Sequence, residues 1–331
     1  MTSNTRPTTS EAIHRRTGPT FHLATRLFPE RVRYPTHVAY AFFRVADDVV
    51  DTPEARDPDA QRRELAALRD GALGREPADD PVVAAFRDLC DERDVPDAEV
   101  ETFVAAMARD VEATRYETFA DLEEYLRGSA VAVANVMLAV MDPEDPEAAR
   151  PHAAALAEAL QLTNFLRDVR EDVTEYGRVY LPLETLAAHG VTEAQVERLD
   201  YSEGFAAAVE SELRRAEERY WTGVAGVEYL PPDCRLPVLL AAVLYADYHR
   251  LVRARDHDVL TRPPTLTRTR RLSLLARTLW HWRRTRDAVA TFRAVTDVPG
   301  GGHVSTDDGG RSPSRDRGVA RRVAGALRLR T

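Results

Sequence analysis

The chain alternates between long segments with apolar residues at helical spacing and short polar breaks that contain proline or glycine. Ala, Leu, Arg and Glu dominate the segments, and runs of β-branched residues are short, which favours helices over strands. No repeat and no interdomain linker interrupts the pattern, so we expect one all-α domain over residues 12–297. Breaks between helices are expected near residues 29–35, 52–58, 71–81, 94–96, 143–151, 176–182, 190, 231–232 and 263–264.

The two ends of the chain differ in composition from this domain. Residues 1–11 are polar and are expected to be flexible, without the apolar segment of a secretory signal. Residues 298–331 form a predicted disordered tail, rich in Gly, Ser and Asp at first and basic towards its end. The longest apolar stretches, 130–141 and 236–246, are shorter than the ~18–20 residues that span a bilayer. We therefore expect a cytoplasmic protein without a transmembrane helix.

One predicted helix, at residues 36–50, is apolar on nearly all sides yet carries aligned polar residues. Tyr40, Arg44, Asp47 and Asp51 are 4, 3 and 4 residues apart, so they share one helical face. Carboxylates in apolar surroundings are unfavourable unless something compensates their charge. A Mg²⁺ ion would compensate two of them, because it takes oxygen ligands from one or two carboxylates and from phosphates.

A second apolar helix, predicted at residues 154–169, has a similar polar face. Gln161, Asn164, Asp168 and Asp172 are 3, 4 and 4 residues apart, and Arg167 lies beside them. Guanidinium groups suit phosphate oxygens. In a chain with 54 acidic residues an isolated acid pair at this spacing is most often a solvated helix face. Two such faces on apolar helices, each with a nearby arginine, instead favour a site for metal ions and a diphosphate.

Charge is distributed unevenly along the chain. It contains no lysine, and its net charge of −9 divides into an acidic part, residues 1–250, and a basic part, residues 251–331. The acidic part argues against nucleic acid as a partner, and the lysine-free composition fits either a high-salt cytoplasm or a GC-rich genome. Residues 268–286 combine arginine with Leu and Trp, which fits either contact with a membrane surface or a last core helix. Two distant cysteines, Cys90 and Cys234, form no disulfide framework or zinc motif.

The motifs at residues 40–51, Tyr-Ala-Phe-Phe-Arg-Val-Ala-Asp-Asp-Val-Val-Asp, and 160–172, Leu-Gln-Leu-Thr-Asn-Phe-Leu-Arg-Asp-Val-Arg-Glu-Asp, resemble those of the squalene/phytoene synthase family. The resemblance covers residues 17–262 and is greatest to microbial, archaeal-type phytoene synthases. It implies an all-α isoprenoid (terpenoid) synthase fold around an apolar cavity, Mg²⁺ or Mn²⁺ as cofactor, and prenyl diphosphates as substrates. The implied reaction joins two geranylgeranyl diphosphates head to head into phytoene, through a cyclopropyl (prephytoene) diphosphate and with release of diphosphate. This step of carotenoid biosynthesis needs no NADPH.

The resemblance also implies roles for residues of this chain. The implied metal ligands are Asp47, Asp51, Asn164, Asp168 and Asp172, whose aspartates we also count as catalytic, together with Tyr125. The implied substrate-binding residues are Thr17, Thr20, Phe21, Tyr40, Arg44, Gln161, Arg167, Arg178 and Tyr245. Simpler interpretations exist for three of them, because Tyr125 and Tyr245 could be core tyrosines and Arg178 could cap the preceding helix. Asn135 stands where the family usually has glycine, and we expect it to reshape the cavity wall.

Other functions compete with this one. A squalene or dehydrosqualene synthase would use farnesyl diphosphate instead. A chain-elongating prenyltransferase would share the Asp-Asp-x-x-Asp pattern of Asp47–Asp51, but it would carry adjacent aspartates in its second motif. A catalytically silent helical scaffold, or an acidic helical binding protein, fits the composition without explaining both polar faces.

Overall fold

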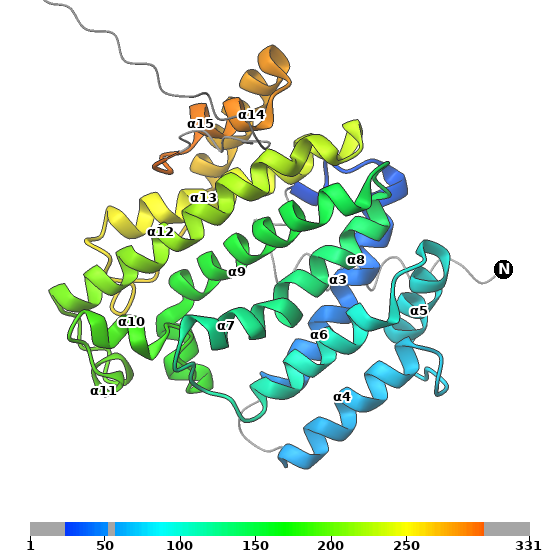
Figure 1. Ribbon diagram of the computed structural model, residues 1–331, viewed down its shortest axis with the longest axis horizontal. Helices are drawn as coiled ribbons and strands as arrows, with labels where there is room; N and C mark the ends of the chain where they lie inside the picture. The colour runs from blue at the N-terminus through cyan, green and yellow to red at the C-terminus, as the bar shows by residue number, and fades with distance from the viewer. Residues whose placement is uncertain (1–23, 52–56, 301–331) are drawn as a thin grey trace, which may run out of the picture. The chain divides into compact units, whose positions relative to one another are not determined.

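The computed structural model describes residues 24–51 and 57–300, which belong to one compact unit (Figure 1). Within these residues there is no β-strand, only an isolated bridge between Arg115 and Val179, so the predicted all-α class is confirmed. The boundaries expected at residues 11 and 298 stay predictions. The elements are α3 (Glu30–Val50), α4 (Pro58–Ala72), α5 (Pro81–Arg93), α6 (Asp97–Asp110), α7 (Phe119–Leu126), η1 (Arg127–Val131), α8 (Ala132–Met141), α9 (Pro146–Tyr176), α10 (Leu183–Ala188), α11 (Glu193–Glu197), α12 (Glu203–Ala225), η2 (Gly226–Tyr229), α13 (Pro232–Arg253), α14 (Arg268–Thr285) and α15 (Ala288–Val295).

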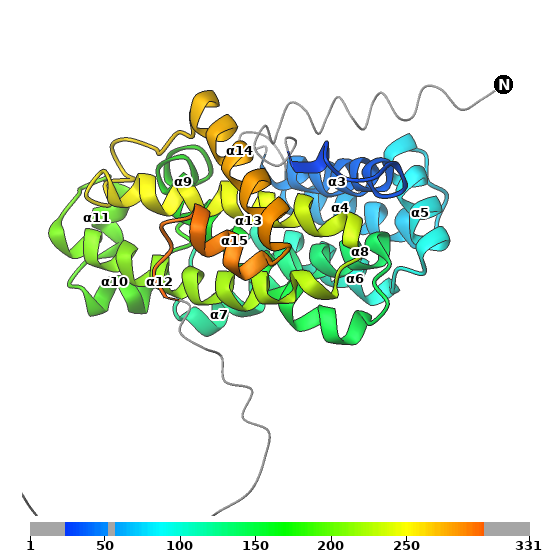
Figure 2. The same ribbon diagram turned by 90° about the horizontal axis from the view of Figure 1, so that it is seen from above.

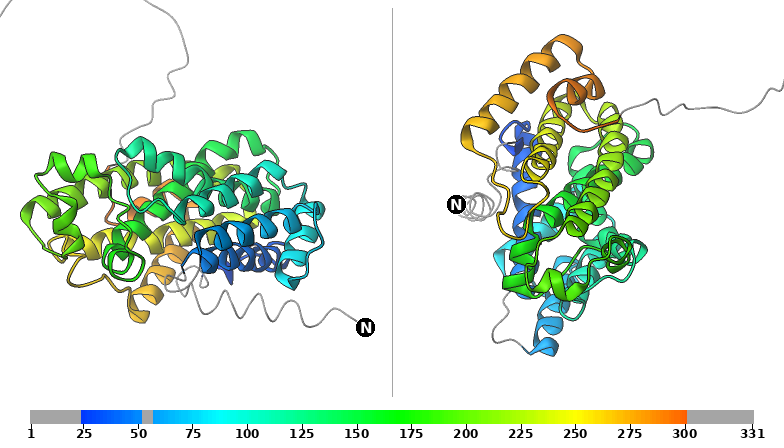
Figure 3. Two further views of the ribbon diagram at one scale, coloured as in Figure 1. Left: turned by 90° about the horizontal axis from the view of Figure 1, so that it is seen from below. Right: turned by 90° about the vertical axis from the view of Figure 1, so that its left-hand side faces the viewer.

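Helix α9 is the centre of the arrangement. It packs against α12, α8 and α13, and α3 packs against α5 and α8 on the other side of the bundle (Figure 1). Helices α14 and α15 cover the outer side of α13, as the views in Figures 2 and 3 show. Apolar faces of α3 to α8 meet with α9 in a core cluster that includes Phe42, Phe86 and Leu122, whereas α12 to α15 pack with α9 in a second cluster that includes Leu240, Leu274 and Phe292. None of the described helices combines the length and the apolar composition needed to cross a membrane.

Two of the predicted breaks are shorter than expected. Pro35 lies inside α3 and Pro151 lies inside α9, although the sequence predicted loops up to these prolines. Each proline removes one backbone hydrogen bond, but both stand near the start of a long helix that tertiary packing holds in place. The N-terminus of α9 is fixed by Asp145, whose side chain accepts a hydrogen bond from the Ala148 amide at 3.0 Å.

A π-helical turn, η1, joins α7 to α8 in one continuous helix. Such turns insert one extra residue into an α-helix and are frequent at functional sites. Gly128 in this turn lies against α6, where an added Cβ would come within 2.6 Å of the Thr102 carbonyl oxygen. Glycine therefore allows α6 and η1 to approach closely, and the turn directs Ser129 and Ala130 into the cavity described next.

Candidate active site

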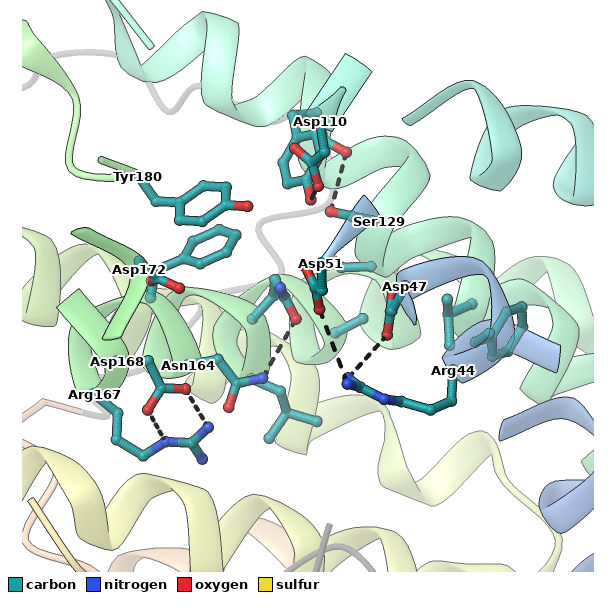
Figure 4. A pocket seen from close by; sticks show the side chains of 18 of the residues that line it. Arg44, Asp47, Asp51, Asp110, Ser129, Asn164, Arg167, Asp168, Asp172 and Tyr180 are labelled. Atoms are coloured by element: carbon teal, nitrogen blue, oxygen red, sulfur yellow. Dashed lines mark hydrogen bonds and ion pairs between the residues drawn. The ribbon is translucent and has the colours of Figure 1, made fainter. Parts of the chain in front are cut away.

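A cavity of about 680 Å³ lies between α3, α9, α13 and the α7–η1–α8 helix. Its wall contains every candidate site residue in the described ranges, namely Tyr40, Arg44, Asp47, Asp51, Tyr125, Gln161, Asn164, Arg167, Asp168, Asp172, Arg178 and Tyr245. Figure 4 labels Arg44 and the aspartates of both faces among them. The remaining candidates, Thr17, Thr20 and Phe21, lie outside the described residues. The structure thus brings both predicted polar faces to one place.

A smaller apolar chamber of about 160 Å³ adjoins this cavity. The two share wall residues, which are Ala130, Val133, Met137, Ala157 and Leu160. The rest of the chamber is lined almost entirely by Ala, Gly, Leu, Val and Met side chains. The combined space is therefore polar where the aspartates lie and apolar beyond them, which suits a ligand with a charged head and a long hydrocarbon tail.

On α3, Arg44 lies among three carboxylates. Its guanidinium is 2.9 Å from Asp48, 3.7 Å from Asp47 and 4.0 Å from Asp51. Burial, together with the neighbouring Asp51, raises the pKa of Asp47 to about 8. One arginine therefore does not provide enough positive charge for this group of carboxylates.

On α9, the Arg167 Nε donates to Asp168 Oδ1 at 2.7 Å. Asn164 contacts Gln161 at 3.4 Å through its amide nitrogen, and its carbonyl oxygen is buried without a hydrogen-bond partner. Burial, with the nearby Asp168 carboxylate, raises the pKa of Asp172 to about 8. This face thus has an unsatisfied oxygen and a poorly compensated carboxylate, and both would be stabilised by a cation.

Arg178, which follows α9, holds the ends of α3 and α6 together. Gly177 ends α9 with a positive φ of 63°, which glycine adopts without strain. The Arg178 guanidinium then donates to Asp51 Oδ1 at 3.0 Å, to the Val50 carbonyl at 3.0 Å and to the Asp110 carbonyl at 3.3 Å. Its side chain therefore binds the C-terminal ends of α3 and α6, whereas the simpler interpretation had it cap the preceding helix.

Aromatic rings form the wall near Arg178. Phe165 and Tyr180 stack with ring centroids 4.0 Å apart, and the Tyr125 ring lies 5.9 Å from Tyr180. On α13, Tyr245 and Tyr248 lie 6.3 Å apart, and the Arg167 guanidinium is 5.2 Å from the centre of the Tyr248 ring. The faces of such rings attract positive charge, so this wall can stabilise a carbocation.

Sequence reasoning missed Asp110, at the C-terminal end of α6. It lines the cavity, and its Oδ2 accepts a hydrogen bond from the Tyr125 hydroxyl at 2.5 Å. Burial raises the pKa of Asp110 to about 6, although the nearby Arg178 opposes the shift. A single acid at the end of an amphipathic helix gives no signal in the sequence. Other cavity residues that were not assigned include Ser129, Phe165, Glu171, Tyr176, Tyr180 and Tyr248.

The prediction for Asn135 was wrong. Its side-chain amide donates to Glu99 on α6 at 2.9 Å, and it lines neither the cavity nor the chamber. Its neighbours Val133 and Ala134 contribute to those walls instead. Asn135 thus belongs to the packing between α8 and α6, and small residues line this part of the chamber.

The profile described as squalene/phytoene synthase matches residues 14–271. The chain belongs to the squalene/phytoene synthase family. It is 34% identical to a phytoene synthase of Rhodobacter capsulatus over 264 residues, which is 79% of this chain and 77% of the relative. A phytoene synthase of Cereibacter sphaeroides is also 34% identical, over 267 residues covering 78% of this chain and 75% of the relative.

Solved structures of the family agree in fold. A dehydrosqualene synthase bound to a ligand superposes with a TM-score of 0.74 and 28% identity, over 84% of this chain and 97% of the other. A squalene synthase of Alicyclobacillus acidocaldarius has a TM-score of 0.68 and 23% identity, over 76% and 94% of the two chains, and it supports the fold alone. The expected isoprenoid synthase fold is thereby confirmed.

Proposed function

We propose that this prenyltransferase joins two geranylgeranyl diphosphates into phytoene through prephytoene diphosphate, with release of diphosphate, in carotenoid biosynthesis. The observation that carries the proposal is the cavity in which both aspartate faces meet and which continues into an apolar chamber. A diphosphate at the aspartates would leave its prenyl tail in the chamber. The relatives named phytoene synthase support this substrate over farnesyl diphosphate.

We further propose that Mg²⁺, or Mn²⁺ in its place, binds between the diphosphate and five residues of the two faces, namely Asp47, Asp51, Asn164, Asp168 and Asp172. Within the described residues no three acidic, histidine or cysteine side chains form a ready-made metal site. Mg²⁺ commonly takes one or two carboxylates and completes its shell with phosphates and water. The raised pKa values of Asp47 and Asp172 and the unpaired Asn164 oxygen fit such ions. Bound there, Mg²⁺ would neutralise the leaving diphosphate and so favour ionisation.

The other cavity residues divide between binding and protection. Arg44, Arg167 and Arg178 provide guanidinium groups for phosphate oxygens, with Tyr40, Gln161 and Tyr245 as further polar contacts. Thr17, Thr20 and Phe21 are proposed to complete this substrate-binding set. The apolar chamber excludes water from the cations that form after ionisation.

Substrate and product are tested in one experiment. The purified protein is incubated with Mg²⁺ and either geranylgeranyl or farnesyl diphosphate, without NADPH, and the hydrocarbon is identified by mass spectrometry. We expect phytoene from the first substrate. Faster turnover of farnesyl diphosphate to dehydrosqualene, or to squalene in a parallel incubation with NADPH, would contradict the proposal, and the first outcome would favour the function of the superposed dehydrosqualene synthase.

Stabilisation by Mg²⁺ should depend on pH. The pKa values of Asp47 and Asp172 rise from 3.8 to about 8 on folding. The folded protein therefore holds these protons more tightly than the unfolded chain, and the metal-free protein loses stability as pH rises from about 4 to about 8. Mg²⁺ needs both carboxylates ionised, so the rise in Tm on adding Mg²⁺ should be larger at about pH 9 than at about pH 6. Scanning fluorimetry with and without Mg²⁺ measures it, and an equal rise at both pH values would contradict the assignment.

The exposed side of α14 supports a proposed peripheral contact with the inner face of the cell membrane. Leu272 and Trp280 are 61% and 50% exposed there, while the opposite side packs Leu274 and Trp282 into the core. Helix α14 carries no acidic residue, and its exposed arginines are Arg268, Arg277, Arg283 and Arg284. Tryptophan beside arginine is typical of helices that lie on anionic lipid surfaces.

Vesicle binding tests this contact. The double variant Leu272→Ser/Trp280→Ser should bind vesicles of phosphatidylcholine and phosphatidylglycerol about tenfold more weakly than the unaltered protein, because it buries less apolar surface. Turnover of detergent-solubilised substrate should stay unchanged. Vesicles of phosphatidylcholine alone control for charge. Equal cosedimentation of both proteins with the anionic vesicles would contradict the contact.

A further inference from the structure

Tyr125 and Asp110 form a buried pair in the cavity wall. Their exposed fractions are 3% and 6%, and the hydroxyl donates to Asp110 Oδ2 at 2.5 Å. This distance is typical of a hydroxyl that donates to an ionised carboxylate. Asp110 Oδ1 is also buried and has no hydrogen-bond partner. The pair thus joins a hydroxyl, whose oxygen can still accept a proton, to a carboxylate with unused accepting capacity.

The surroundings of the pair make its carboxylate unusually basic. Aromatic rings of Tyr116 and Tyr180 lie within 6 Å of the Tyr125 ring, at 5.4 and 5.9 Å between centroids. Burial in this apolar wall raises the pKa of Asp110 to about 6, against the opposing effect of Arg178. Burial also raises the pKa of Tyr125 well above 10, so its hydroxyl cannot lose a proton without a partner that accepts it. Asp110 is that partner.

The other carboxylates of the cavity are placed for a different task. Asp168 is held by Arg167, and Asp47 lies near Arg44. Asp51 accepts from Arg178. These groups face the diphosphate end of the cavity, whereas the carboxylate of Asp110 accepts from a tyrosine in the aromatic wall.

We infer that Asp110, acting through Tyr125, accepts the first of the two protons that the reaction releases, the one lost as the cyclopropane closes. This rests on the proposed function. After the donor diphosphate leaves, the C2=C3 π electrons of the acceptor form a bond to donor C1, and positive charge remains at acceptor C3. A C1–H bond of the donor then breaks, and its electron pair closes the cyclopropane by joining C1 to C3. The proton passes to the Tyr125 oxygen while the Tyr125 hydroxyl proton passes to Asp110 Oδ2, so tyrosine ends unchanged and Asp110 ends as a neutral acid.

Isosteric variants test the relay. Asp110→Asn retains an oxygen that accepts the Tyr125 hydrogen bond but cannot take up its proton, and Tyr125→Phe removes the hydroxyl. Each should lower kcat by about 10²-fold or more, the range of general acid–base catalysis, with KM and Tm little changed. The double variant should lose no more than either single variant, because neither residue of a relay acts without the other. Glu99→Gln, also a carboxylate-to-amide change on α6 but outside the cavity, should leave kcat unchanged.

The kinetic isotope effect on kcat distinguishes a role in proton transfer from a purely structural role, because a structural role would leave it unchanged. With substrate deuterated at C1, the Asp110→Asn variant should show a larger isotope effect on kcat than the unaltered protein, since C–H cleavage becomes rate-limiting. Full activity of Asp110→Asn, additive losses in the double variant, or an unchanged isotope effect would overturn the relay. Should Asp110→Asn not fold, Tyr125→Phe with full turnover would equally overturn it.

If the unaltered protein makes no product from either prenyl diphosphate, the proposed function fails and the relay with it, so the two failures are distinguishable.

Discussion

Replacing Asp51 with Asn should reduce kcat/KM for geranylgeranyl diphosphate by about 10³-fold or more, because the site would lose a proposed metal ligand where charge builds up on the leaving group. Asp51 also accepts a hydrogen bond from Arg178, so the change also removes the charge partner of that guanidinium. The reduction should appear in kcat at saturating Mg²⁺. Steady-state release of diphosphate measures it.

Asp48→Asn is the matched control for this variant. Asp48 is on the same helix and makes an ion pair with Arg44 at 2.9 Å, but it does not line the cavity, and its side chain is 63% exposed. The control removes the same charge, and we expect its turnover to stay within about threefold of the unaltered protein, as for most surface changes. Equal losses in the two variants would show that net charge on α3, rather than ligation by Asp51, is what matters.

Arg178→Met should impair both stability and turnover. The substitution leaves the Val50 and Asp110 carbonyl oxygens without their donor and leaves Asp51 without its ion pair. Removing one partner of such a buried arrangement costs about 3 kcal/mol or more. We expect a clear fall in Tm, measured by calorimetry, and a loss of turnover of about 10²-fold from the missing positive charge.

Arg178→Lys separates charge from geometry. Lysine retains the positive charge but lacks the planar fork that reaches Asp51 and two carbonyl oxygens together. Its Tm should therefore lie between those of Arg178→Met and the unaltered protein. Full stability of Arg178→Met would contradict the structural role of Arg178 at the ends of α3 and α6.

The sequence was most informative where the site is local. The faces on α3 and α9 follow from residues three and four apart in otherwise apolar helices, so spacing alone predicted that Asp47 aligns with Asp51 and that Asp168 aligns with Asp172. The spacing of these residues could not by itself predict that the two faces meet, because their meeting depends on how α3 and α9 pack into the bundle. The family resemblance supplied this part.

The features that were missed depend on tertiary structure or on a local irregularity. Asp110 reaches the cavity only because α6 ends beside Tyr125 and Arg178, which are distant in the sequence. Asn135 was placed in the wall by comparison with the family pattern, but the π-helical turn before it directs its side chain to Glu99. The predicted break extends to Pro151 because proline usually interrupts a helix, whereas α9 begins at Pro146 after its Asp145 cap and continues through Pro151.

The π-helical turn decides which residues of one helix face the cavity. Tyr125, Ser129, Val133 and Met137 all line the cavity, although residues four apart drift about 40° around an α-helix, or about 120° over the three intervals. Absorbing one extra residue in η1 reduces the total drift to about 20°. If the same residues formed a regular α-helix without the π-turn, Val133 and Met137 would be rotated by about 100° out of the wall. The π-turn, rather than a regular helical repeat, therefore keeps Tyr125, Ser129, Val133 and Met137 on one wall, so a change that regularises η1 without shortening the helix should disturb that wall.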